Sequence, residues 1–283
     1  MNAIPKWQRT SKVGDAEALW RDRLIYEPAE VYHSRDREYL TSHRLAAFRE
    51  CPLLYQQLQS GQIVIPDTPA YMIGRAAHVL ILEGHERFDE LYVIGGPINA
   101  KAGTPYGSHM TAFAQWAAQQ GGKCVLSSDQ FQLIQCMCDA VHAHPLAAQL
   151  LASGVAERVL RTTYCEIPCQ VRLDWIAWDY GLVEFKTADD LRWFESDARR
   201  FQYVYQLAFY RQIIAQATSE VLPIYVIAVE KRQPYRCGVW HVNEEALETA
   251  EDENATAILR LRECMLTNTW PTGYESLRTL YGL

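Results

Sequence analysis

The sequence predicts an α/β protein, because short apolar strands alternate with helical segments along most of its 283 residues. Two strands joined by a tight turn form its centre, over Val171–Ile176 and Leu182–Lys186, with turn-forming residues at 179–181. A third run, Pro223–Glu230, is apolar enough to be a strand buried on both faces. Aliphatic and aromatic residues make up 49% of the chain, which is typical of a globular protein.

Charge and composition exclude some classes of protein. The net charge is −7, so no overall basic field attracts nucleic acid, but 21 of the 27 basic residues are arginine, which suits local phosphate contacts. No apolar run approaches the roughly 18 residues of a membrane span, and the N-terminus lacks the apolar core of a signal peptide. We therefore expect a cytoplasmic protein that does not enter a membrane, with its eight irregularly spaced cysteines reduced.

The first 62 residues are expected to form an arm followed by helices. A short helix is predicted from about Asp15. Thr41 and Ser42 offer an N-cap for a helix over His43–Glu50, and a second helix follows Pro52 and runs to Gly61.

The next part of the chain is predicted to be mostly helical. Tyr71–Glu83 reads as one buried helix, and His78 lies in it among apolar neighbours. Such a histidine is most often a core residue with satisfied hydrogen bonds. Phe88–Ile94 is predicted to be a strand, and the Gly- and Pro-rich residues 95–109 a loop. Three further helices are expected at about Thr111–Gln119, Gln130–His142 and 145–152.

After the central hairpin, the pattern predicts a long amphipathic helix over Phe194–Ala217. Tyr203, Gln206 and Tyr210 share one stripe of it, and the simplest interpretation of that stripe is packing against the sheet. An edge strand over Tyr235–His241 and an acidic helix at about Glu244–Thr267 complete the chain.

Three charged residues lie within the apolar strands of the central hairpin. Glu184 and Lys186 are two residues apart and therefore share a face, and pairing of the strands brings Asp174 near them. Buried charges are costly unless they are paired or bound to metal. The residues alone leave two alternatives open, a salt bridge from Lys186 or a divalent-metal site.

A zinc site is the other arrangement of ligands that the sequence raises. Cys136, Cys138, His142 and His144 are close in the sequence, but Cys136 does not share the helix face of Cys138 and His142. The spacing therefore disfavours zinc.

Four signals occur in a fixed order along the chain: GRAAH, RLDWI, VEFK and QLAFY. This order resembles the PD-(D/E)XK nuclease superfamily and, within it, the phage-type recombination exonucleases of the RecE and lambda-exonuclease group, over about residues 32–230. Leu173 stands where the superfamily usually has proline. The resemblance implies a restriction-endonuclease-like core, a central mixed β-sheet flanked by helices. We expect one nuclease domain over 1–283, with its catalytic core at about 63–241 and a C-terminal helix and tail at 242–283.

The resemblance also implies a metal centre. Asp174 and Glu184 would bind Mg²⁺, which Mn²⁺ could replace, together with the main-chain carbonyl of Phe185 and the imidazole of His78. Lys186 would orient or activate the attacking water.

Further roles follow from the same resemblance. Gln206 and Tyr210 would hold the substrate strand or the pair of catalytic side chains. Glu157, at the start of the strands predicted over 155–169, would be an outer contact to metal or water. Arg35 and Ser42 would bind the 5′ phosphate of DNA, since a capped helix N-terminus beside an arginine suits a phosphate.

The function implied is a 5′→3′ exonuclease that acts on double-stranded DNA ends. It would release 5′ mononucleotides and leave 3′ single-stranded tails for annealing-type recombination. A ring-shaped homotrimer, a single-strand annealing protein as partner and a phage or prophage origin in a bacterial cell are further implications. The alternatives are an endonuclease of the same fold, a Cas4-like iron–sulfur nuclease, or a non-catalytic DNA-end-binding protein. Only Cys237 and Cys264 follow the core, so no iron–sulfur cluster is expected.

Overall fold

A computed structural model describes residues 3–7, 20, 23–66, 69–99, 103, 106–107 and 109–279. The helix expected from about Asp15 begins outside these residues. Within the described part of the chain, no helix combines the length and hydropathy that crossing a membrane requires.

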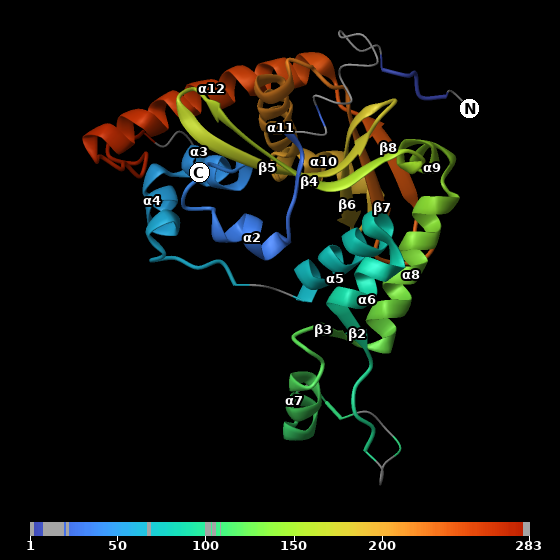
Figure 1. Cartoon of the computed structure of the whole chain (residues 1–283). Helices are drawn as coiled ribbons and strands as arrows, with labels where there is room; N and C mark the ends of the chain where they lie inside the picture. Colours follow the sequence, from blue (N-terminus) through green and yellow to red (C-terminus); the bar gives the residue numbers. More distant parts are fainter. Residues whose placement is uncertain are drawn as a thin grey trace.

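A six-stranded mixed sheet lies in the middle of the fold, with helices on both faces (Figure 1). In spatial order, its strands are β1 (Ile25–Tyr26), β4 (Gly154–Tyr164), β5 (Ile167–Ala177), β6 (Gly181–Ala188), β7 (Ile224–Glu230) and β8 (Cys237–His241). Strands β6 and β7 run parallel, and the other neighbouring strands are antiparallel. The predicted α/β class, with a mixed sheet flanked by helices, is confirmed.

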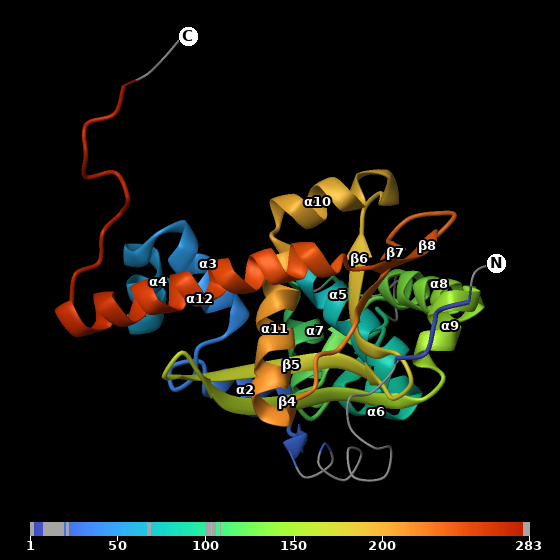
Figure 2. The same ribbon diagram turned by 90° about the horizontal axis from the view of Figure 1, so that it is seen from above.

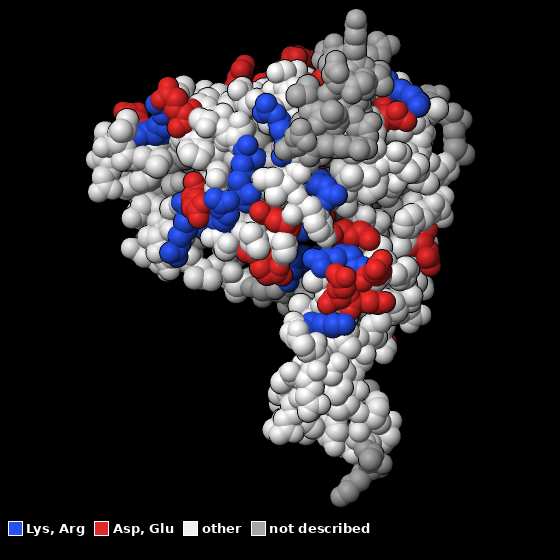
Figure 3. All heavy atoms as spheres, viewed as in Figure 1, with Lys and Arg blue, Asp and Glu red and all other residues white. Residues whose placement is uncertain are grey.

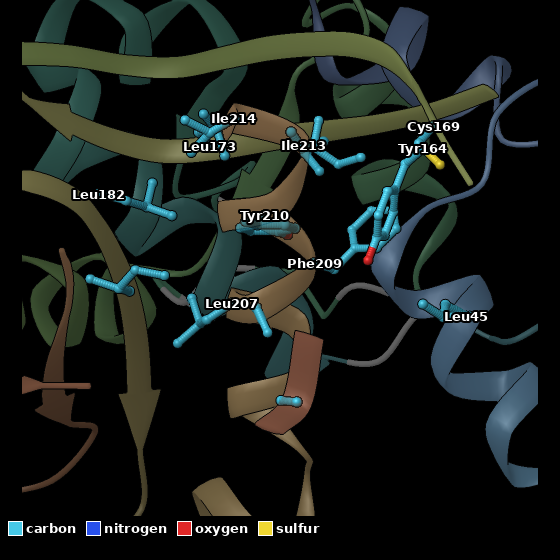
Figure 4. Close-up of a cluster of buried hydrophobic side chains, with 14 of the residues drawn as sticks. Leu45, Tyr164, Cys169, Leu173, Leu182, Leu207, Phe209, Tyr210, Ile213 and Ile214 are labelled. Atoms are coloured by element: carbon cyan, nitrogen blue, oxygen red, sulfur yellow. The ribbon is translucent and has the colours of Figure 1, made fainter. Parts of the chain in front are cut away.

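Two layers of helices cover the sheet. One face packs against α3 (Ser42–Glu50), α11 (Tyr203–Thr218) and α12 (Glu244–Thr267), with α4 (Pro52–Ser60) beside them. Figure 4 shows apolar side chains of α11 meeting Leu173 of β5 and Leu182 of β6. The other face packs against α5 (Pro69–His78), α8 (Ser128–Ala143) and α9 (Pro145–Leu151). The alternation of β6 divides its residues between these layers, because Leu182 contacts the first layer and Phe185 the second.

The remaining elements lie around this core. A separate two-stranded sheet, β2 (Tyr92–Ile94) with β3 (Cys124–Leu126), leads to α7 (Thr111–Ala118), which projects away from the body (Figure 1). On the face seen in Figure 3, the surface over α7 carries neither basic nor acidic side chains. The short elements are α2 (Ala29–Ser34), the 3₁₀ turn η2 (Leu191–Trp193) and α10 (Phe194–Arg200).

Two predicted elements in the first half of the chain need correction. The helix predicted to end at Glu83 changes at Val79–Glu83 into a π-helix and then continues as α6 (Gly84–Leu91). The strand predicted from Phe88 was therefore wrong in its first part, since only Tyr92–Ile94 is extended. Phe88 is buried in the helical layer, with its ring 4.9 Å from that of Tyr92.

The long helix predicted over Phe194–Ala217 is two helices. Alpha-helix α10 ends at Arg200, and α11 begins at Tyr203. Between them Gln202 adopts the left-handed conformation, with φ 57° and ψ 39°. No glycine or proline marks this break in the sequence, so periodicity alone could not predict it.

An ion-pair cluster fixes α11 against α12. The guanidinium of Arg211 is 3% exposed and binds Glu251 at 2.5 Å and also Glu244, both on α12. Arg49 of α3 donates to Asn254 of α12 at 2.7 Å. Three helices are thus joined by polar contacts on the side away from the sheet, which holds α11 in one position.

We expect Arg211→Ala to lower the free energy of unfolding by about 3 kcal/mol, because it leaves the largely buried Glu251 without its counter-charge. The matched control is Arg262→Ala, which removes the exposed pair with Glu166 and should cost at most about 1 kcal/mol. Urea unfolding followed by circular dichroism measures both values. Equal losses in the two variants would contradict the clamping role of Arg211.

Candidate active site

The site begins at a local irregularity between β4 and β5. The two strands pair on either side of Glu157 and Asp174, but these two residues are absent from the ladder. Glu157 has a positive φ of 53°. Along β5, Leu173 and Ile176 both contact the α11 layer, although residues three apart normally face opposite sides of a sheet. The alternation of side chains between the two faces of the sheet therefore changes phase here. The carboxylates of Glu157 and Asp174 lie opposite each other at this point.

The pairing of β5 with β6 also ends at this point. The turn before β6 uses Gly181, at φ 116°, where a Cβ atom would lie 2.3 Å from the carbonyl oxygen of Pro223. The ladder runs to Trp175 opposite Val183 and stops. Beyond it, Oδ2 of Asp174 accepts a hydrogen bond from the backbone N–H of Phe185 at 2.8 Å. A carboxylate thus replaces the missing strand partner and is held at the split between the strands.

His78 reaches this split from the last residue of α5. Its Nε2 lies 3.0 Å from the carbonyl oxygen of Phe185 and 3.4 Å from Oδ2 of Asp174, and its Nδ1 lies 3.4 Å from Oε1 of Glu157. The π-helical turn begins at the next residue, Val79. Such turns occur often at functional sites, where they change the direction of side chains.

His78, Glu157 and Asp174 form a group that could hold a metal ion. Each offers one ligand atom, and these atoms lie within 4.8 Å of one another. Oε2 of Glu184 is buried and finds no hydrogen-bond partner among the described residues. A buried carboxylate oxygen without a hydrogen-bond partner is costly unless a cation binds it. The imidazole and carboxylate donors of this group therefore fit a hard divalent ion such as Mg²⁺ or Mn²⁺.

Glu184 belongs to a second set of contacts on the α11 side. Its Oε1 accepts from Nζ of Lys186 at 2.5 Å and from the amide of Gln206 at 3.1 Å. The same amide donates to the hydroxyl of Tyr210 at 2.9 Å, and the Gln206 oxygen lies 3.4 Å from Lys186. The Lys186–Glu184 salt bridge that the sequence offered as one alternative is therefore present, and Gln206 fixes its geometry.

The shifted pKa values of three buried groups reflect an excess of negative charge at the site. Burial and the neighbouring charge of Glu184 raise the pKa of Asp174 to about 7. Burial alone would lower the pKa of His78, but the charges of Asp174 and Glu157 outweigh it and raise the pKa to about 9. Burial likewise opposes the charge on Lys186, yet Glu184 and Asp174 raise its pKa. The site therefore favours cations.

Arg172 is a contact that sequence reasoning missed. Its Nε lies 2.7 Å from Oε2 of Glu157. Burial raises the pKa of Glu157, but His78 and Arg172 outweigh this effect and keep it below its ordinary value. Arg172 lies two residues before Asp174, so the alternation of the strand could have indicated it.

The two residues suggested for the 5′ phosphate lie apart from this group. The guanidinium of Arg35 binds Glu38 at 2.8 Å, and Ser42 is buried at the first turn of α3. In the described part of the chain, no hydrogen bond or ion pair joins either residue to the metal group.

The cysteine and histidine group does not converge in the same way. Sγ of Cys138 lies 3.4 Å from Nδ1 of His142, within one helix. Among the described residues, the three-residue group that could hold a metal is the one around His78, and it contains no cysteine.

Comparison with known proteins agrees with this geometry. The sequence model of the PDDEXK-like domain of unknown function (DUF3799) matches residues 42–279. A crystal structure from Eubacterium rectale, titled "Putative exonuclease", aligns with a TM-score of 0.63 and 15% identity, covering 91% of this chain and 97% of that one. At this identity the alignment shows a shared fold. No curated protein sequence matches. The resemblance to the PD-(D/E)XK superfamily is confirmed at the level of the superfamily.

We expect Mn²⁺ or Mg²⁺ to raise the Tm of the protein by about 5 °C at a hundredfold excess over Kd, because the ion binds only the folded state. Asp174→Asn should remove this rise. It should leave the metal-free Tm unchanged or higher, because it relieves repulsion with Glu184 while the amide oxygen still accepts from Phe185.

Differential scanning fluorimetry measures these shifts. Asp139→Asn, on an exposed position of α8, is the control and should respond as the wild type does. A full metal response in Asp174→Asn would place the ion elsewhere.

Proposed function

The chain belongs to the family of PDDEXK-like domains (DUF3799), and from this premise we propose that it is a Mg²⁺-dependent exonuclease that degrades double-stranded DNA ends in the 5′→3′ direction. The observation that carries the proposal is the convergence of His78, Asp174, Glu184 and Lys186 from one helix and two strands, around a surplus of carboxylate oxygens. Metal ligands beside a fixed ammonium group suit the hydrolysis of a phosphodiester, because both cations offset the charge that develops at the phosphate.

The proposed ligands are His78, Asp174 and Glu184 with the carbonyl oxygen of Phe185, and Glu157 joins them. When bound there, Mg²⁺ supplies charge neutralisation at the phosphate and a water of lowered pKa. Oδ2 of Asp174 accepts from the N–H of Phe185 and lies 3.4 Å from Nε2 of His78, which holds this carboxylate beside the other ligands. Glu157 is held from its other side by Arg172, so it presents one oxygen to the group.

Lys186 acts on the attacking water and on the charge of the phosphate. Glu184 and Gln206 hold its ammonium group from the α11 side, and its raised pKa keeps it protonated. Gln206 is itself oriented by Tyr210, whose pKa burial raises well above the ordinary value, so the hydroxyl stays neutral. These residues thus position one cation at the centre before substrate arrives, which lowers the cost of reorganisation during the reaction.

The finer parts of the proposal rest on the resemblance to phage-type recombination exonucleases. We propose that Arg35 and Ser42, before and within the first turn of α3, receive a 5′ phosphate. On the face seen in Figure 3, Lys and Arg side chains lie among Asp and Glu side chains in the middle of the molecule, and we propose that the DNA backbone contacts these cations. A homotrimeric ring, a single-strand annealing protein as partner and 3′ single-stranded products complete the proposed role.

Lys186→Ala should abolish nucleotide release from linear duplex DNA in Mg²⁺, with a loss of at least about a hundredfold, while end binding is retained. The loss follows because no other described ammonium group hydrogen-bonds to Glu184. Lys231→Ala is the control, since Lys231 directly follows the neighbouring strand β7 but pairs with the exposed Asp189. Release of acid-soluble nucleotide measures activity. Wild-type release by Lys186→Ala would remove the lysine from the mechanism.

Polarity is tested with duplexes labelled separately at each 5′ and 3′ end. We expect early release of the 5′ label as a mononucleotide, with the 3′ label retained on a long strand. Early release of the 3′ label would refute the proposed direction. Cleavage of covalently closed circular DNA would identify an endonuclease instead.

A further inference from the structure

An aromatic ring is turned out to solvent at the break between α10 and α11. Phe201 is 54% exposed, whereas Phe48, Phe88, Phe185 and Phe209 are almost completely buried. The left-handed conformation of the next residue, Gln202, produces this exposure by ending one helix before the other begins. The Phe201 ring is therefore open to a ligand at the surface between the two helices.

The exposed ring is connected to the candidate active site. Phe201 stacks with Tyr203, with ring centroids 5.9 Å apart and planes inclined by 24°. Nζ of Lys186 lies 4.9 Å from the centroid of the Tyr203 ring. Figure 2 shows α10 beside the end of β6 and the start of α11. One aromatic ring therefore separates Phe201 from the proposed catalytic ammonium group.

An exposed cation covers the same ring. Cζ of Arg200 lies 4.4 Å from the centroid of Phe201, and the Arg200 side chain is 69% exposed. Its ion pair with Asp197, at 3.5 Å, is exposed and therefore weak. A ligand with a flat aromatic face and a phosphate could replace Arg200 over the ring and pair with its guanidinium.

The position of the ring is fixed from a third helix. Arg49 of α3 hydrogen-bonds to the side chain of Gln202, and the same guanidinium lies over Tyr205 of α11. The break is therefore held by side-chain contacts on both sides, which keeps Phe201 at one distance from the centre.

We propose that Phe201 is a stacking platform for a nucleobase of the DNA strand whose phosphate lies at Lys186. A nucleotide combines a π face with a phosphate, and stacking on an aromatic ring tolerates every base. The base must be unstacked on at least one face, as it is at a frayed end, because a base within a duplex has neighbours on both faces. This inference rests on the proposed function, and it adds recognition of a frayed DNA end to the cleavage of its backbone.

Abasic substitution tests the contact directly. The probes are short duplexes with a mismatched 5′ end, in which each terminal nucleotide in turn is replaced by an abasic analogue. Fluorescence anisotropy in EDTA measures binding without cleavage. The wild type should lose affinity by about fivefold or more at one position, where the base stacks. Phe201→Ala should bind base-bearing and abasic ends equally at that position, and Phe201→Trp should keep the difference.

Tyr274→Ala is the matched control, since Tyr274 is an exposed ring under Arg278 in the segment after α12, and it should keep the wild-type pattern. Phe201→Ala with an undiminished abasic penalty would overturn the proposal. A wild type that binds and degrades DNA but shows no abasic penalty at any position would overturn it too, and would leave the proposed function standing. A wild type that neither binds nor degrades DNA would remove both.

Discussion

The burial of several carboxylates at one point of a β-sheet is the constraint on which the rest of this structure depends. Glu157, Asp174 and Glu184 are all largely withdrawn from water, and burial together with the charges of Glu184 and Glu157 raises the cost of ionising Asp174. Arg172, His78 and Lys186 supply three cations, each close to a different carboxylate. One carboxylate oxygen still lacks a partner among the described residues. A site built in this way gains most from a further cation, which is why a metal-dependent reaction suits it better than a purely structural network.

The fold meets this constraint by changing the sheet locally. The register of β4 and β5 places Glu157 opposite Asp174, and the end of the β5–β6 ladder frees the backbone of Phe185 to hold Asp174. Helix α11 then adds the polar side of the centre. Its apolar stripe packs on Leu173 and Leu182, while Arg211 ties its opposite side to α12 (Figure 4). The position of Gln206 is thus set by packing on one side and by ion pairs on the other.

The sequence could predict the hairpin and its charges because both depend on local rules. Alternation places Glu184 and Lys186 on one face, and the structure shows them bonded to each other. The order of the four motifs indicated that His78 reaches the hairpin from a distant helix, a contact that no periodicity can give. The sequence could not indicate the positive φ of Glu157 or of Gln202, because neither is a residue that favours that conformation. Tertiary contacts impose both, from His78 and Arg172 in one case and from Arg49 in the other.

These two strained positions share a further property. Each costs on the order of 1 kcal/mol relative to ordinary backbone, so each persists only because its surroundings determine it. At Glu157 the strain brings a carboxylate to the ligand group, and at Gln202 it interrupts a helix that the sequence would otherwise continue. A continuous helix would place the ring of Phe201 on a different face from Tyr203, because residues two apart in a helix do not share a face. The break instead leaves that ring exposed, one aromatic contact from Lys186. The strained backbone at both positions therefore serves the same end, because each places a side chain at or beside the centre before any ligand binds.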